Sequence, residues 1–187
     1  MNGVEAEPYS IPWQVRLSTC GGTLISPRHV LTAAHCWSRM DSELVVGDHW
    51  SRNASDGIVH KVCRYKDHPK YDRSRKAYDF SIMHLKEPVD IGPQAVPACL
   101  PTAKHGGDFL VGKNLTVSGW GALYAGGHSP DVLHVVDVKG ISNEQCREMY
   151  SKIGRGHMIN SENLCAGDII DGGEDSCQGD SGGRSKH

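Results

Sequence analysis

A serine that could act as a nucleophile lies in the stretch 175–183, Asp-Ser-Cys-Gln-Gly-Asp-Ser-Gly-Gly. Because glycine has no Cβ, a turn containing Gly179 and Gly182 allows unusual backbone angles and the close approach of a substrate. The hydroxyl of Ser181 would be exposed there beside backbone N–H groups, which together could form an activated nucleophile and an oxyanion hole. The alternative is a glycine-rich hairpin turn that happens to contain serine.

A serine nucleophile needs a base, and the base needs a carboxylate that sets its tautomer and stabilises the imidazolium. His35 follows Thr-Ala-Ala and precedes Cys36, and Asp79 stands at the start of an alternating segment that would hold it in the interior. Residue type alone leaves other interpretations open. His35 could be an ordinary surface or core histidine, Asp79 could be a surface acid, and Asp67 and Asp72 are neighbouring carboxylates.

Composition limits the possible classes of protein. The chain has 187 residues, of which 38% are hydrophobic and 22% charged, with a net charge of −2, as expected for one globular domain or two small lobes. A basic stripe is absent from the sequence, as is an apolar run of about 20 residues, so neither nucleic acid nor a membrane is indicated as a partner. Seven cysteines and two sequons, at Asn53 and Asn114, favour a secreted, extracellular protein. The first 19 residues do not have the pattern of a signal peptide.

The positioning elements are predicted to be short strands. Period-two alternation and β-branched residues predict strands at 13–17, 23–25, 29–32, 44–46, 58–62 and 80–85. The change to Ala-Ala predicts a short helical turn that carries His35. In the strand 80–85, Phe80, Ile82 and Leu85 are expected near the core.

The second half resumes after a segment rich in proline and glycine, about 86–107, which is the candidate linker between two lobes. Strands are predicted at 115–121 and 132–138. Ser142 and Gln145 fit a capping box that would start a helix over 143–151, burying Cys146 and either Met149 or Tyr150. The expected fold is all-β, with a first lobe at about 1–95 and a second at about 108–187.

Residues 1–183 resemble a trypsin-like (chymotrypsin-family) serine protease. Seven stretches carry the resemblance, and their order and spacing also match: 12–15 (PWQV), 20–25 (CGGTLI), 30–36 (VLTAAHC), 79–82 (DFSI), 117–121 (VSGWG), 163–167 (NLCAG) and 175–183 (DSCQGDSGG). The resemblance implies a single peptidase domain with two six-stranded antiparallel β-barrels, the second incomplete in this chain. It also implies a monomer that cleaves proteins or peptides and that protein protease inhibitors would bind.

The resemblance assigns a role to each candidate residue. His35 would be the general base, Asp79 its carboxylate partner and Ser181 the nucleophile of an acyl-enzyme mechanism. The backbone N–H groups of Gly179 and Ser181 would form the oxyanion hole. Asp175 would lie at the floor of the specificity pocket and select Arg or Lys before the cleaved bond; its alternative is a loop acid beside Glu174.

Disulfides follow from the same resemblance. Cys20 with Cys36 would brace the histidine loop, and Cys146 with Cys165 would bridge the second lobe. Cys177 would pair with a cysteine outside this sequence, Cys99 matches a position that tethers a propeptide in some members, and Cys63 has no expected partner. No metal or other cofactor is expected, although Asp48 and Asp56 flank the loop that binds calcium in some relatives.

Two departures from the family pattern suggest an alternative function. Met1 directly precedes Asn2-Gly3, so the amine that would pair with Asp180 is not expected, and the chain reads Arg-Ser-Lys-His after Gly183, where the family continues with further strands. The main expectation is a serine endopeptidase. The alternative is a truncated, catalytically inactive homologue or isoform that binds a partner or inhibitor.

Overall fold

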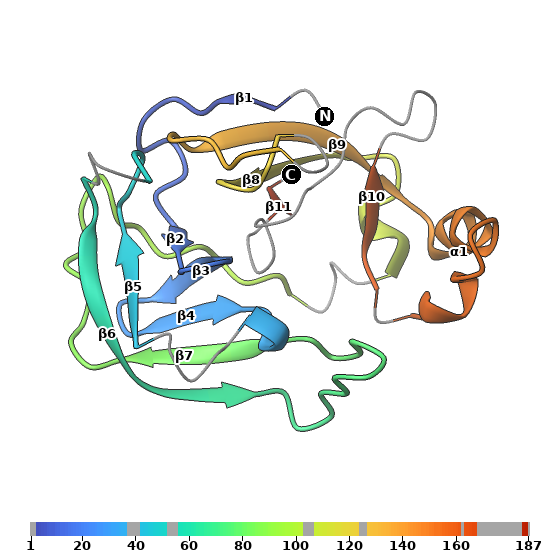
Figure 1. The fold of residues 1–187 in the computed structure, drawn as a ribbon, viewed down its shortest axis with the longest axis horizontal. Helices are drawn as coiled ribbons and strands as arrows, with labels where there is room; N and C mark the ends of the chain where they lie inside the picture. The colour runs from blue at the N-terminus through green and yellow to red at the C-terminus, as the bar shows by residue number, and fades with distance from the viewer. Residues whose placement is uncertain are drawn as a thin grey trace.

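The structure is a computed structural model that describes residues 3–36, 42–51, 56–102, 107–123, 127–161, 163–167 and 185–186. These residues form a closed barrel, an open sheet and a single α-helix beside the open sheet (Figure 1). Within the described residues, no helix has the length and apolar character needed to cross a membrane.

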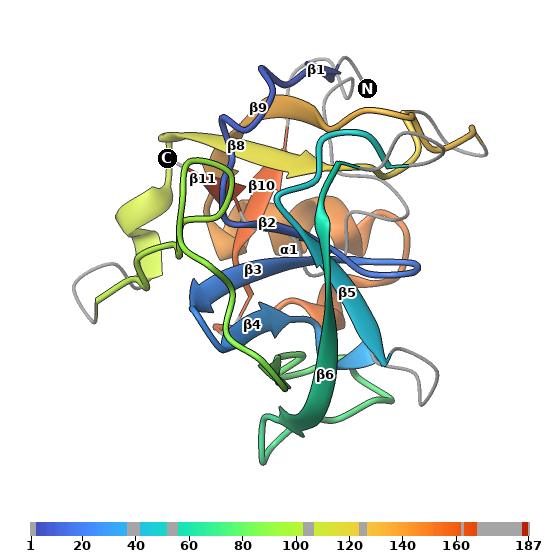
Figure 2. The ribbon, with the colours of Figure 1, turned by 90° about the vertical axis from the view of Figure 1, so that its left-hand side faces the viewer.

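The first lobe is a closed six-stranded antiparallel barrel. Its strands are β2 (Gln14–Arg16), β3 (Gly21–Ser26), β4 (His29–Thr32), β5 (Glu43–Val46), β6 (Ile58–Asp67) and β7 (Ser81–Leu85). They pair around the barrel in the order β2-β3-β4-β7-β6-β5. Figures 1 and 2 show the barrel from two sides. The apolar side chains at the barrel centre, such as Val15, Leu24, Val30 and Met83, are fully buried and supply the main driving force for its closure.

Strand β7 corrects the predicted side-chain directions. Ser81, Met83 and Leu85 are buried, whereas Phe80 is 52% exposed and Ile82 is half-buried. Because side chains alternate along a strand, Phe80 and Ile82 cannot share a face with Leu85. The prediction was right for Leu85 and wrong for the other two. The small Ser81 takes the inward position.

The second lobe contains an open antiparallel sheet. Its strands are β1 (Val4–Glu5), β8 (Asn114–Gly119), β9 (His134–Ile141), β10 (Cys165–Gly167) and β11 (Ser185–Lys186). The order is β1-β9-β8-β11, and β10 also pairs with β9. The mostly-β class and the six-stranded first barrel are confirmed, and in the described part of the chain the second lobe does not close. Strand β1 shows that residues 4–5 join this second sheet.

Helix α1 (Asn143–Ser151) begins and ends where the sequence predicts. Ser142 caps it, its Oγ accepts a hydrogen bond from Gln145 N, and the Gln145 side chain completes the capping box. Cys146 is buried, but Met149 and Tyr150 are 38% and 42% exposed, so their expected burial was wrong. The helix packs through a small cluster of Ile141, Cys146, Ile159 and Cys165. Short 3₁₀ turns occur at η1 (Ala34–Cys36), η3 (Gly107–Leu110) and η4 (Gly156–Met158).

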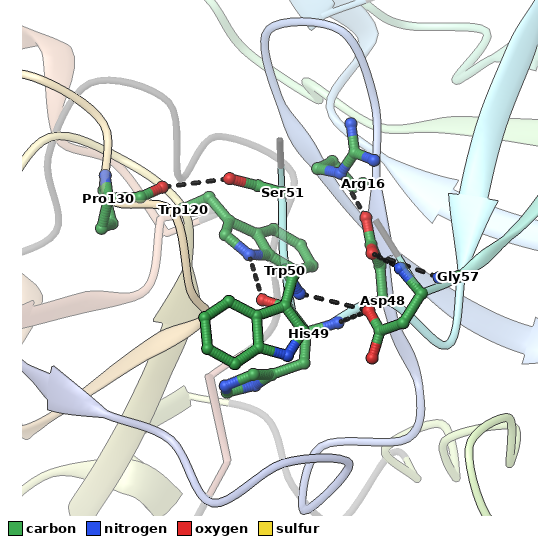
Figure 3. A network of polar contacts seen from close by, with 9 residues as sticks. Arg16, Asp48, His49, Trp50, Ser51, Gly57, Trp120 and Pro130 are labelled. Atoms are coloured by element: carbon green, nitrogen blue, oxygen red, sulfur yellow. Dashed lines mark hydrogen bonds and ion pairs between the residues drawn. The ribbon is translucent and has the colours of Figure 1, made fainter. Parts of the chain in front are cut away.

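The segment after β5 connects the lobes (Figure 3). The carbonyl of His49 accepts hydrogen bonds from Trp120 Nε1 at 3.1 Å and from Leu133 N at 3.0 Å, while Ser51 Oγ donates to Pro130 O at 3.0 Å. Because these groups come from both halves of the chain, the lobes are held together by specific polar contacts as well as by packing.

The predicted linker follows the first barrel closely over its described part, 86–102. Its backbone N–H groups at Val89, Val96 and Ala98 donate to carbonyls of the barrel lobe at 2.7, 3.1 and 2.8 Å. These bonds attach the segment to the barrel before the chain enters the second lobe.

Candidate active site

Turn η1 positions His35 at the end of strand β4. Thr32 Oγ1 donates to Gly21 O at 2.8 Å, and Cys36 N donates to Ala33 O at 3.1 Å, which shapes the turn. A disulfide joins Cys36 to Cys20, with 6.0 Å between the Cα atoms. The predicted helical turn is therefore present, and it is tied covalently to the residue preceding β3.

Asp79 contacts His35 through both carboxylate oxygens. Oδ2 lies 2.5 Å from His35 Nδ1, and Oδ1 accepts a hydrogen bond from the His35 backbone N–H at 2.8 Å. A carboxylate beside Nδ1 favours the tautomer in which Nδ1 carries the proton, leaving Nε2 basic. The imidazole can then accept a proton at Nε2, which lies 3.7 Å from the disulfide sulfur of Cys36.

The other two candidate carboxylates have different roles. Asp72 Oδ1 accepts hydrogen bonds from Ser74 Oγ at 2.6 Å and from Ser74 N at 2.8 Å, and these bonds lower the pKa of Asp72. Asp67 ends strand β6, where its backbone pairs with that of Ser81 on β7, and its Oδ1 is buried without a hydrogen-bond partner in the described part of the chain. Of the three carboxylates, the tertiary structure brings Asp79 to His35. Its side chain is 19% exposed, so it is partly rather than fully enclosed.

Tyr71 is a residue that residue-type reasoning missed. Burial, and secondarily the negative charge of Asp79, raises the pKa of the Tyr71 phenol, because both disfavour a phenolate. Its hydroxyl is buried and has no hydrogen-bond partner within the described part of the chain. A tyrosine three residues after His68 gave no chemical signal in the sequence.

The expected nucleophile lies outside the described residues. The same holds for Gly179, Asp175, Asp180 and Cys177, which flank Ser181, and for the sequon at Asn53. The other sequon residue, Asn114, is exposed at the first position of β8.

The cysteines form the two expected bridges. Besides Cys20–Cys36, Cys146 on α1 is joined to Cys165 on β10, with 6.2 Å between the Cα atoms. Cys63 and Cys99 are exposed and free, and Cys63 Sγ donates weakly to His84 O at 3.4 Å. The cluster of Cys20, His35 and Cys36 does not offer thiolates to a metal, because its two sulfurs are joined to each other.

The two acids of the calcium-type loop are engaged by hydrogen-bond donors. Asp48 Oδ2 receives Arg16 Nε at 2.5 Å, and its Oδ1 receives Gly57 N at 3.3 Å. Asp56 receives the Tyr9 hydroxyl at 2.5 Å and His49 N at 2.9 Å (Figure 3 draws part of this network). A cation there would have to displace these donors.

The same donors determine the charge state of Asp56. Burial alone would raise its pKa, but the hydrogen bonds from Tyr9 and from the backbone N–H groups of His49 and Trp50 outweigh burial. They hold the pKa of Asp56 well below its usual value.

Comparison with known proteins identifies the family of the chain. The family model named Trypsin matches residues 1–184. The chain is 36% identical to Trypsin 5G1 of Aedes aegypti over 193 residues, which covers 100% of this chain and 70% of that protein. It is 37% identical to the serine proteinase stubble of Drosophila melanogaster over 196 residues, covering 92% of this chain but only 24% of that longer protein.

A solved structure shows the same fold. Neuropsin, described as a serine protease expressed in the limbic system of mouse brain, superposes with a TM-score of 0.85 and 31% sequence identity. The match covers 99% of this chain and 81% of the neuropsin chain. Sequence and fold therefore agree over the whole length described, and the chain belongs to the trypsin family of serine endopeptidases.

Proposed function

We propose that this chain is the catalytic domain of a serine endopeptidase that cleaves protein or peptide substrates after Arg or Lys. The observation that carries the proposal is the double contact of the Asp79 carboxylate with His35. A half-buried carboxylate with both oxygens on one histidine is the arrangement a general base of this kind requires.

His35 and Ser181 carry the chemical steps of the proposal. His35 Nε2 removes the proton of Ser181 as Oγ attacks the carbonyl carbon, and the N–H groups of Gly179 and Ser181 hold the resulting oxyanion. The intermediate collapses, His35 gives its proton to the leaving amine, and an acyl-enzyme remains. A water molecule, deprotonated by His35, then releases the acid and restores the serine.

Asp175 supplies the substrate preference in this proposal. A carboxylate at the bottom of a pocket pairs with a guanidinium or an ammonium group, which selects Arg or Lys at the residue before the cleaved bond. The two disulfides fit an oxidising, extracellular environment, and we propose that the protein is secreted. Protein protease inhibitors are its expected macromolecular partners.

The test is labelling by a fluorophosphonate probe, combined with hydrolysis of an arginine ester and of a phenylalanine ester. We expect the probe to label the oxidised protein, and this labelling should be lost in Ser181→Ala and strongly reduced in His35→Ala. The protein should hydrolyse the arginine ester faster than the phenylalanine ester. Asp175→Ser should remove that preference while retaining labelling. A folded protein that neither takes the label nor hydrolyses either ester would contradict the proposal.

A further inference from the structure

The backbone immediately before Asp79 has an unusual conformation. Tyr78 has a φ of 52°, in the left-handed region that bulky residues seldom occupy. Such a conformation persists where the surrounding structure holds it, and it often occurs beside functional groups. Asp79, the carboxylate that contacts His35, is the next residue along the chain.

A stack of aromatic rings holds Tyr78. The Tyr78 ring lies parallel to that of His68, with 5.0 Å between the centroids and 9° between the planes. Lys70 Nζ lies 5.4 Å from the Tyr78 centroid, within the range of a cation–π contact. The His68 ring is itself anchored, because its Nδ1 accepts a hydrogen bond from Lys70 N at 3.2 Å.

Backbone hydrogen bonds connect this stack to Asp79. Phe80 N donates to Tyr78 O at 2.8 Å, which closes a tight turn with Asp79 at its centre. Phe80 O in turn accepts a hydrogen bond from His68 N at 2.8 Å. The turn around Asp79 is therefore attached to the stack at both ends, by the Tyr78 ring at one end and by the His68 backbone at the other.

We propose that His68 and Tyr78 are positioning residues that aim the Asp79 carboxylate at His35. Asp79 must direct one oxygen to His35 N and the other to Nδ1 at the same time, and a rotation of the turn would break one of these bonds. The stack fixes that rotation. This inference rests on the proposed function for its effect on catalysis, but its effect on the His35–Asp79 contact is independent of Ser181.

The test compares variants that keep or remove the ring. Tyr78→Phe keeps the stack, Tyr78→Ala removes the ring and retains the strained backbone, and Tyr78→Gly removes the ring but tolerates the positive φ. His68→Ala removes the partner ring at an exposed position. Tyr150→Ala, at an exposed tyrosine on α1, is the matched control.

Two measurements are made on each variant. The first is the strongly deshielded NMR signal of the His35 Nδ1 proton, which reports a short hydrogen bond to a carboxylate. The second is kcat and KM for an arginine ester. In Tyr78→Ala and His68→Ala we expect loss or a large shift of the proton signal. A misplaced catalytic group should also lower kcat by about 10- to 100-fold, with little change in KM.

Tyr78→Phe and Tyr150→Ala should match the wild type in both measurements, and Tyr78→Gly should lie between wild type and Tyr78→Ala. A merely structural stack predicts a lower melting temperature with the proton signal and kcat unchanged in Tyr78→Ala and His68→Ala, and that result would overturn the inference. If Tyr78→Ala does not fold, the exposed His68→Ala variant decides the question. A wild-type protein that shows the proton signal but hydrolyses no ester contradicts the proposed function alone, and the proton comparison still tests the positioning role.

Discussion

At the scale of single residues, the contact between His35 and Asp79 is the basis for the proposed role of His35 as a general base. Two bonds of 2.5 and 2.8 Å join the carboxylate to the ring and to the backbone of the same residue. The backbone bond matters because it prevents the carboxylate from following the ring if the ring rotates. The tautomer and the ring orientation are therefore set by one side chain.

Asp79→Asn should lower kcat by about 10⁴-fold, the size known for the corresponding change in a trypsin-family enzyme. An amide can donate to Nδ1, which favours the tautomer with its proton on Nε2 and removes the base. Steady-state hydrolysis of an arginine ester measures the effect. Asp72→Asn, in the same loop but turned toward Ser74, is the matched control and should keep wild-type activity. Equal losses in the two variants would contradict the role of Asp79.

Asp56 should make stability depend on acid pH. Because its pKa is lower in the folded protein than in the unfolded chain, its stabilising contribution is present above the unfolded value of about 4 and is lost as pH falls below it. In thermal melts from pH 7 to pH 2, Asp56→Asn should have a lower melting temperature than the wild type at pH 7. The difference between the two melting temperatures should become smaller below about pH 4. Glu148→Gln, on an exposed face of α1, should follow the wild-type curve at every pH. A constant gap across the range would contradict this assignment.

At the scale of elements, two disulfides of similar span have different local tasks. Cys20–Cys36 has a sequence separation of 16 and fastens η1 to the start of β3, whereas Cys146–Cys165 has a separation of 19 and fastens α1 to β10. The first acts on the turn that carries His35. The second acts on a peripheral helix whose apolar contacts are few.

Replacing either pair with serines should therefore cost about 3 kcal/mol of unfolding free energy, the chain-entropy value for loops of this length. Urea unfolding under oxidising conditions measures this cost. Under strongly native conditions, Cys20→Ser/Cys36→Ser should also lower kcat, because His35 loses its covalent support, while Cys146→Ser/Cys165→Ser should retain it. Equal kcat values in the two folded variants would show that the first bridge does not position His35.

At the scale of the whole molecule, the two lobes share a buried polar contact. The Ser118 hydroxyl on β8 donates a hydrogen bond to Gln14 Oε1 on β2 at 2.8 Å. Gln14 is 2% exposed and Ser118 is 3% exposed. They lie 104 positions apart in the sequence. Because a buried amide oxygen without a partner is costly, this bond favours one relative placement of the barrel and the open sheet.

Ser118→Ala should lower the unfolding free energy by about 1–3 kcal/mol, because it leaves the Gln14 oxygen buried without a donor. Gln14→Leu/Ser118→Ala removes both polar groups and should cost less than the sum of the single changes, which a double-mutant cycle from urea unfolding measures. Strict additivity of the two losses would mean that the pair does not couple the lobes.

Local patterns in the sequence predicted much of the fold correctly. The helix over 143–151 was found because its capping box involves residues three apart, and the turn at His35 was found because composition changes abruptly there. Such features depend on neighbours along the chain, so the sequence contains their physical cause. Alternation likewise predicted the strand at 80–85, but not which of its faces is buried.

The sequence was sufficient to infer the family, the strand-rich lobes and the short list of residues able to do chemistry. The family resemblance pointed to Asp79 among three carboxylates, and the folded chain places Asp79 against His35. Only folding determines that Phe80 lies outside and Ser81 inside, and that His68 stacks on Tyr78. Each of these outcomes depends on contacts between segments that are distant in sequence. Those contacts form only once the barrel has closed, so the local propensity of each segment could not indicate these outcomes.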